Sequence, residues 1–187
     1  MTEGPDCIYK CLGCGNHLTK GSIASGNTFG AKIYSDGKRI APNLPEFPDL
    51  TQCKKCNTFL WLRKIKESGT YFGDIKNTEW EKADRVEFLE IDDYFIALNS
   101  GIAESRFDEI YIRNAIWWAY NDRIRNGNDI FNNEDDELRW KENCERKNKW
   151  VVGIGARNEH ALDEHIYVED MEKALKMIVE LLRLSAE

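Results

Sequence analysis

The spacing of hydrophobic and polar positions changes along the chain and divides it into two parts. Up to about residue 66 the apolar residues form short runs suited to strands, such as residues 59–65, where apolar side chains would occupy both faces in alternation. From about residue 86 onward they recur every three or four positions, as on one face of a helix. The pattern predicts an α+β fold in which a small β unit is followed by an α-helical domain.

The boundaries follow from the same pattern. We assign residues 1–66 to the β unit and residues 86–187 to the helical domain. Residues 67–85 between them contain Gly69, Gly73 and Asp74, residue types that interrupt regular structure. We therefore expect this segment to be a linker with little regular structure.

About four helices are expected in the second domain, at residues 94–98, 105–126, 132–149 and 169–184. Asp92 or Asp93 is expected to cap the first, and Ser105 with Asp108 forms a capping pair for the second. Trp117 and Trp118 are adjacent in the second helix, so their side chains point about 100° apart. This favours packing against two neighbouring elements over a binding platform.

A hairpin is predicted within the β unit. Ser35-Asp36-Gly37-Lys38 separates two β-prone stretches, and an Asp-Gly pair suits the two positive φ angles of a type I′ turn. The sequence therefore predicts a two-residue turn at Asp36 and Gly37.

Two cysteine pairs provide the clearest chemical signal: Cys11-Leu-Gly-Cys14 and Cys53-Lys-Lys-Cys56, called here the first and second hooks. A two-residue spacer lets both sulfurs of one hook reach the same ion, and two hooks complete a tetrahedral Zn²⁺ site. Gly15 and Asn57, directly after the hooks, are residue types that readily adopt the left-handed conformation needed to turn the chain under a metal. The four cysteines are thus predicted to be zinc ligands.

The long interval between the hooks does not oppose this prediction. It is 38 residues, and doubling a loop adds only about 0.6 kcal/mol of closure entropy, against about 10–16 kcal/mol from a structural zinc. Two disulfides or an iron–sulfur cluster would also use four cysteines, and Cys7 or His17 lies close enough in the sequence to replace one ligand. The pattern favours zinc, in a closed site that has no open position for catalysis.

The start of the chain bears on the compartment. Residues 1–7 have neither the basic start nor the apolar run of a secretory leader, and no apolar stretch approaches the length of a membrane span. We expect a cytoplasmic protein that does not contact a membrane, with its thiols reduced.

Charge is distributed unevenly. Residues 1–66 carry 10 Lys and Arg against 5 Asp and Glu, whereas residues 67–187 carry 16 against 28. A Zn²⁺ ion with four thiolates adds two negative charges, which leaves the β unit only mildly basic. The acidic second domain would repel phosphate, so nucleic-acid binding is disfavoured.

Several motifs of the first third together resemble a family of uncharacterised bacterial proteins with an N-terminal zinc ribbon and a helical C-terminal part. They are the two hooks, the first followed by Gly15, together with Ser25-Gly-Asn-Thr-Phe-Gly-Ala31 and Tyr34-Ser-Asp-Gly-Lys38. The resemblance extends loosely to Trp117-Trp-Ala-Tyr-Asn-Asp122. It implies a zinc ribbon and no particular activity, because the family has no assigned activity.

Three classes of function stay open. The first is a protein–protein interaction module or adaptor, in which zinc stabilises a β scaffold and the acidic helices present a groove to a protein partner. The second is a nucleic-acid-binding ribbon, with Lys54, Lys55, Arg63 and Lys64 as phosphate contacts. The third is an enzyme with a site between the two parts, with Asp36, Asp122 or His165 as acid–base groups. No spacing pairs these three groups, so the sequence identifies no catalytic residue, and the first class is favoured.

Overall fold

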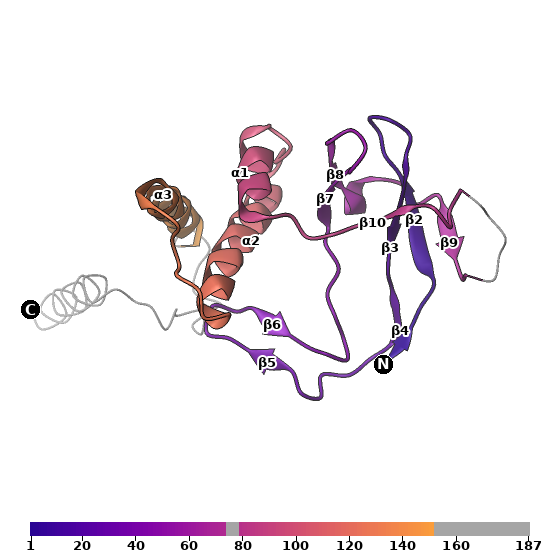
Figure 1. The fold of residues 1–187 in the computed structure, drawn as a ribbon, viewed down its shortest axis with the longest axis horizontal. Coiled ribbons are helices and arrows are strands. Elements are labelled where there is room, and N and C mark those ends of the chain that lie inside the picture. Colours follow the sequence, from indigo (N-terminus) through magenta and orange to yellow (C-terminus); the bar gives the residue numbers. More distant parts are fainter. Residues whose placement is uncertain (74–78, 152–187) are drawn as a thin grey trace, which may run out of the picture.

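The computed structural model describes residues 1–73 and 79–151 and shows a mixed α+β architecture. The helices gather on one side of the molecule and most strands on the other (Figure 1). Within the described residues the helices are α1 (Ile91–Asn99), α2 (Arg106–Arg125) and α3 (Glu134–Val151). The predicted helix at residues 169–184 lies outside the described residues.

The strands are short and form several small sheets. They are β1 (Thr2–Glu3), β2 (Asp6–Lys10), β3 (His17–Lys20), β4 (Ile23–Ser25), β5 (Lys32–Ile33), β6 (Arg39–Ile40), β7 (Leu50–Gln52), β8 (Phe59–Trp61), β9 (Gly69–Tyr71) and β10 (Asp84–Arg85). β1 pairs with β4, β5 with β6, and β7 with β8, each antiparallel. Each hook lies in the loop of a hairpin, the first between β2 and β3 and the second between β7 and β8.

Two short strands from the segment expected to be a linker complete the largest sheet. β2 and β3 form an antiparallel pair, to which β9 adds on one edge and β10 on the other, in the order β10-β3-β2-β9. A Cβ on Gly69 would lie 2.6 Å from the Trp80 ring, so the absence of a side chain there lets the indole pack directly on β9. β9 has three residues and β10 has two, and their pairing ties the segment expected to be a linker to the sheet.

Strand β8 joins the β unit to the helices through a shared hydrophobic core. Leu60 points toward the hooks, whereas Trp61 packs among helical side chains, as the alternation of a strand requires. The buried residues of the helical core are Leu50, Trp61, Ile91, Tyr94, Ala97, Ile112, Ile116 and Tyr120. The predicted two-faced strand is therefore correct, and each of its faces belongs to a different core.

The helix starts agree in part with the sequence. Ser105 and Asp108 form the predicted capping box at the start of α2, each side chain bonding the other's backbone N–H. Helix α1 instead starts at Ile91 with Glu90 at the cap position, and no side chain caps it. Asp92 and Asp93 lie in the first turn of α1, where negative charge complements the helix dipole without capping.

The β5–β6 hairpin is present, but its turn differs from the prediction. Gly37 has a positive φ of 78°, and among the described non-glycine residues only Asn57 has a positive φ. The turn spans residues 34–38, closed by hydrogen bonds from the Tyr34 N–H to the Lys38 carbonyl and from the Gly37 N–H to the Tyr34 carbonyl, both 2.9 Å. A type I′ turn, which needs positive φ at Asp36 too, is therefore wrong.

None of the helices in residues 1–73 and 79–151 is both long enough and apolar enough to cross a bilayer.

Candidate metal centre

The two hooks have equivalent backbone geometry. In each, the N–H of the first cysteine donates to the carbonyl five residues later, from Cys11 to Asn16 at 2.8 Å and from Cys53 to Thr58 at 2.9 Å. The N–H four residues after each first cysteine donates back to that cysteine's carbonyl, at 2.9 Å in the first hook and 2.8 Å in the second. The donors of these returning bonds have positive φ angles, 73° at Gly15 and 58° at Asn57, as their residue types predicted.

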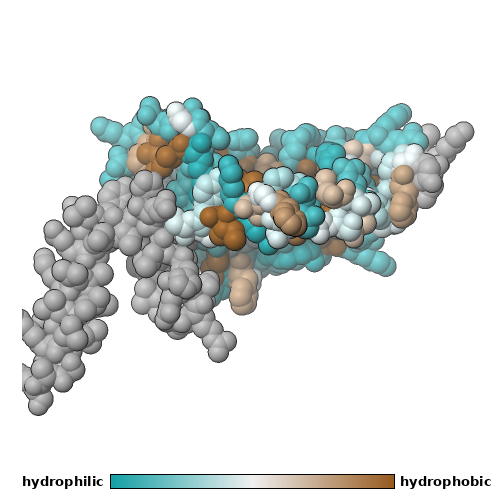
Figure 2. Space-filling view, turned by 90° about the horizontal axis from the view of Figure 1, so that it is seen from below, coloured by the Kyte–Doolittle hydropathy of each residue, from teal (hydrophilic) through white to brown (hydrophobic). Residues whose placement is uncertain are grey.

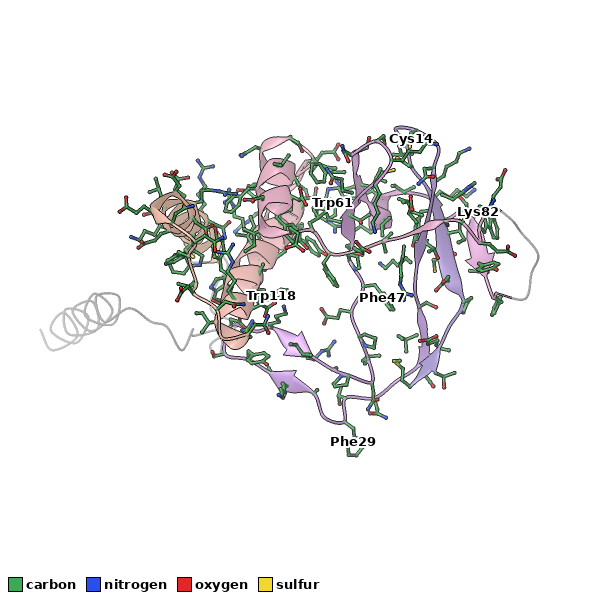
Figure 3. All side chains as sticks on the ribbon, in the orientation of Figure 1. Cys14, Phe29, Phe47, Trp61, Lys82 and Trp118 are labelled. Atoms are coloured by element: carbon green, nitrogen blue, oxygen red, sulfur yellow. The ribbon has the colours of Figure 1, made fainter. Side chains whose placement is uncertain are left out.

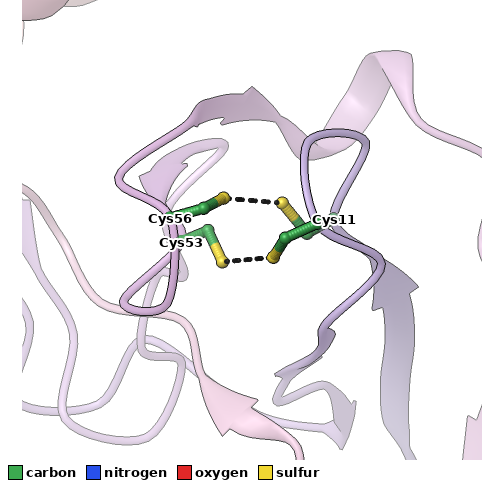
Figure 4. Close-up of side chains that lie close together, drawn as sticks. Cys11, Cys53 and Cys56 are labelled. Carbon is green, nitrogen blue, oxygen red and sulfur yellow. Dashed lines mark hydrogen bonds between the residues drawn. The ribbon is translucent and has the colours of Figure 1, made fainter.

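This geometry brings the four predicted ligands together. The Sγ atoms of Cys11 and Cys56 are 3.5 Å apart, those of Cys14 and Cys53 are 3.7 Å apart, and all four sulfurs lie within 4.8 Å of one another (Figure 4). Four sulfurs at about 2.3 Å from a central ion form a tetrahedron with edges of about 3.8 Å. The four cysteines are thus positioned to coordinate one metal ion.

Burial and hydrogen bonding act differently on the thiols. Burial raises the pKa of Cys11 to about 12. The Thr58 hydroxyl lies 3.1 Å from the Cys56 sulfur, and this hydrogen bond lowers the pKa of Cys56 to about 6. Closely packed thiols ionise together only when a cation offsets their charge, so the donor set fits a bound metal cation.

Close packing around the hooks involves Gly13 and Thr58. A Cβ on Gly13 would lie 2.5 Å from the Thr58 hydroxyl and 3.3 Å from the Cys56 sulfur. The first hook therefore leaves space for Thr58, whose hydroxyl bonds Cys56, a ligand of the second hook. The approach of Gly13 to Thr58 was not predicted, because spacing within a hook carries no information about the facing hook.

The alternative ligands lie elsewhere. Cys7 is in β2, opposite Lys20 and Thr70, and burial raises its pKa. The Nδ1 atom of His17 lies 4.0 Å from a Glu79 carboxylate oxygen. Among the described residues, the metal-ligating cluster contains neither of them.

Two of the proposed acid–base residues meet outside this centre. The Asp36 carboxylate is buried and accepts hydrogen bonds from the Asn121 amide at 2.7 Å, from Arg125 and from the Lys38 N–H at 3.0 Å. Asp122 accepts from Lys38 Nζ and from Arg125 at 2.7 Å. These residues are called the Asp36 cluster; His165 lies outside the described residues.

The Asp36 cluster is arranged for attachment rather than proton transfer. Burial alone raises the pKa of Asp36, but the hydrogen bonds from Asn121 and Arg125 outweigh it and hold this pKa below its usual value. The Trp118 indole also donates to the Asp36 backbone carbonyl at 3.0 Å. A carboxylate that stays ionised and fully bonded is a poor general acid or base, and here it holds the hairpin to α2.

Most of the basic residues suggested as phosphate contacts are paired within the chain. Arg63 and Lys64 both bond the buried Asp108 carboxylate, at 2.5 Å and 2.8 Å. Lys54 bonds Glu87 at 2.8 Å, and no ion pair is recorded for Lys55 among the described residues. The sequence predicted the capping role of Asp108 but not its pairing with Arg63 and Lys64.

A depression of about 330 Å³ lies between the start of α1 and the end of α2. Its charged lining includes Asp92, which bonds Arg139 at 2.8 Å, Asp122, and Arg123, which bonds Asp136 at 2.5 Å. Charges that are already paired within the chain offer little to a partner. This depression is therefore a poor candidate for the predicted acidic groove.

We compared the chain with protein-family models, with curated proteins and with solved structures, and none of them matches it. Evidence for function therefore comes from the chain itself, and its resemblance to a bacterial zinc-ribbon family stays a prediction.

Proposed function

We propose that Cys11, Cys14, Cys53 and Cys56 bind one Zn²⁺ as a structural centre of a protein-interaction module. The observation that carries this proposal is the continuity between the second hook and the helical core: Trp61 follows Cys56 by five residues and is buried among α1 and α2. A zinc ion that fixes the hook also fixes the strand on which the helices pack. The ion supplies coordination bonds and charge compensation, and no step of catalysis.

The contact surface proposed for the partner is the exposed part of residues 28–40. The side chains of Phe29 and Ile33 are 82% and 77% exposed, and Phe29 points away from the rest of the molecule (Figure 3). Figure 2 shows the molecule from below, the side toward which Phe29 points in Figure 3, and apolar patches lie there among hydrophilic surface. Exposed apolar side chains that gather on one face and are rimmed by polar residues mark protein–protein interaction sites.

The Asp36 cluster supports this assignment because it restrains the hairpin. The tip is bonded to α2 through a buried carboxylate, and Arg125 also stacks on the Tyr34 ring at 4.0 Å. A preordered surface loses less conformational entropy on binding. Lys32 is exposed beside Ile33, so the partner is expected to be a protein with an apolar patch and an acidic group next to it.

Comparative affinity enrichment tests the module. The wild type, a Phe29→Ser/Ile33→Ser variant and a Leu138→Ser control would be immobilised and their bound proteins quantified. Leu138 is a matched control because it is 57% exposed on α3, away from the hairpin. We expect a partner that binds the wild type and the control but binds the hairpin variant at least about 30-fold more weakly in purified form.

Two outcomes would contradict the proposal. Identical bound proteins for all three chains would exclude the hairpin as the contact surface. Binding of duplex DNA or single-stranded RNA that weakens steeply with salt and with a Lys54→Ala/Lys55→Ala change would instead support the nucleic-acid hypothesis.

A further inference from the structure

The four sulfurs differ in how accessible they are and in which neighbour faces them. Cys14 is exposed, whereas Cys11 and Cys53 are 2% and 0% exposed. The sulfur contacts at 3.5 Å and 3.7 Å both run from one hook to the other (Figure 4). An oxidant arriving from solvent therefore reaches Cys14 and Cys56 before the two buried cysteines, and the sulfur that faces each of them belongs to the opposite hook.

We propose that a peroxide converts the metal centre into two disulfides that cross between the hooks, Cys14–Cys53 and Cys11–Cys56. The inference rests on the proposed zinc centre for its starting state. A disulfide needs its sulfurs at about 2.05 Å, so each pair closes by roughly 1.5 Å of side-chain movement. The hooks stay joined, so the ribbon keeps its connection after the metal leaves.

The chemistry is a sequence of two-electron oxidations. The Cys14 thiolate attacks a peroxide oxygen, the O–O bond breaks, and a sulfenic acid and hydroxide form. The Cys53 thiolate then attacks the Cys14 sulfur, an S–S bond forms, and hydroxide leaves. A second peroxide does the same for Cys11 and Cys56. Four thiolates, two hydrogen peroxide molecules and four protons give two disulfides and four waters, and Zn²⁺ leaves without a change of oxidation state.

The alternative product, one disulfide within each hook, would have the opposite structural consequence. It would leave the hooks unconnected, because no covalent bond or metal would then join the segment at Cys11 to the segment at Cys53. The two products are therefore separable both by their linkage and by whether tertiary structure persists.

Tryptic mapping distinguishes them in the full-length chain. The zinc-loaded protein would be treated with hydrogen peroxide, alkylated and digested without reduction. Cleavage after Lys54 and Lys55 separates Cys53, in peptide 40–54, from Cys56, in peptide 56–63, whereas peptide 11–20 keeps both cysteines of the first hook. Crossed disulfides link all three peptides; disulfides within hooks link 40–54 to 56–63 alone.

Fragmentation of the three-peptide product between Cys11 and Cys14 assigns each bond in the wild type. The fragment that holds Cys14 is expected to carry peptide 40–54, and the fragment that holds Cys11 is expected to carry peptide 56–63. The reverse assignment, linkage to Cys7 or Cys144, or sulfinic acid as the main product would overturn the proposal.

A zinc-sensitive dye, near-ultraviolet circular dichroism and a metal-free sample separate this proposal from the zinc proposal. We expect release of one zinc per chain with the dichroism of the wild type retained. Because zinc is proposed to hold the hooks together, protein stripped by a chelator before oxidation should give a mixture of linkages. Crossed disulfides in a protein that purifies without zinc would contradict the zinc centre and support the proposed disulfide pairing. If the protein contains zinc but forms disulfides within the hooks, or loses its near-ultraviolet dichroism on oxidation, the proposed disulfide pairing is wrong and the zinc centre is supported.

Discussion

The indole Nε1 of Trp61 donates a hydrogen bond to the backbone carbonyl of Ile102 at 2.9 Å. Trp61 ends the strand that follows the second hook, and Ile102 lies in the loop between α1 and α2. The same indole packs edge-on against Tyr111 at 5.2 Å between ring centres. The β unit thus supplies a buried residue to the helical core.

Replacing Trp61 tests this connection. Trp61→Ala is expected to lower the free energy of unfolding by about 3–5 kcal/mol, because it removes a large buried side chain. Trp61→Phe retains a ring but leaves the Ile102 carbonyl without its donor, for a cost of about 1–3 kcal/mol. Urea unfolding measures both; equal stability of all three proteins would show that the β unit and the helices do not share a core.

Asp108 is expected to stabilise the protein in a pH-dependent way. Burial raises its pKa, but hydrogen bonds from Lys64, Ser105 and Arg63 outweigh burial and set it at about 2, below the usual 3.8. Because the folded pKa is the lower one, the stabilisation is present above about pH 4 and is lost as the pH falls toward 2. Asp108→Asn should therefore cost about 1–3 kcal/mol at pH 7, since Arg63 and Lys64 stay partly hydrated.

The measurement is urea unfolding of wild type and Asp108→Asn at pH 7, 5 and 3. The difference between the two proteins should be similar at pH 7 and 5 and smaller at pH 3. A difference that grows on acidification would contradict the assigned role of the carboxylate.

The Asp36 cluster is expected to control local opening of the β5–β6 hairpin. Asp36→Asn keeps the side-chain shape but removes the charge that faces Arg125, and it should cost about 2–4 kcal/mol. Hydrogen exchange of the residue 34–38 amides should become faster. Glu46→Gln is the matched control: its ion pair with Arg39 is exposed, at 3.4 Å, and should contribute less than about 1 kcal/mol. Equal exchange in both variants would exclude the cluster as a restraint.

Thr58 is expected to tune the metal centre. Thr58→Val keeps the side-chain volume and removes the hydroxyl that bonds the Cys56 sulfur. Loss of such a supporting contact is expected to weaken metal affinity about 10–100-fold. Competition with a chromophoric chelator measures this, with Thr70→Val, an exposed threonine of β9, as the control. Unchanged affinity would show that this hydroxyl does not act on the ligand.

What the sequence predicted well is local. The hooks, the left-handed Gly15 and Asn57, and the Ser105–Asp108 capping box each depend on residues within a few positions of one another. The alternation at β8 was visible for the same reason. These features need no knowledge of distant segments.

What the sequence missed depends on contacts between distant segments. Asp36 does not have the positive φ angle of a type I′ turn. Its carboxylate accepts hydrogen bonds from Asn121 and Arg125, more than 80 residues away. The pairing of Arg63 with Asp108 spans 45 residues. β9 and β10 pair with β2 and β3, which lie far earlier in the chain. Neither spacing nor composition encodes such partners.

X-ray absorption at the zinc edge of the purified full-length protein tests the central claim most directly, combined with elemental analysis for stoichiometry. We predict one zinc per chain with four sulfur neighbours at about 2.3 Å and no nitrogen or oxygen neighbour. The ion should be absent from Cys11→Ser and Cys53→Ser proteins. Iron in place of zinc, a nitrogen neighbour such as His17, or a fully folded protein without metal would contradict the structural zinc centre.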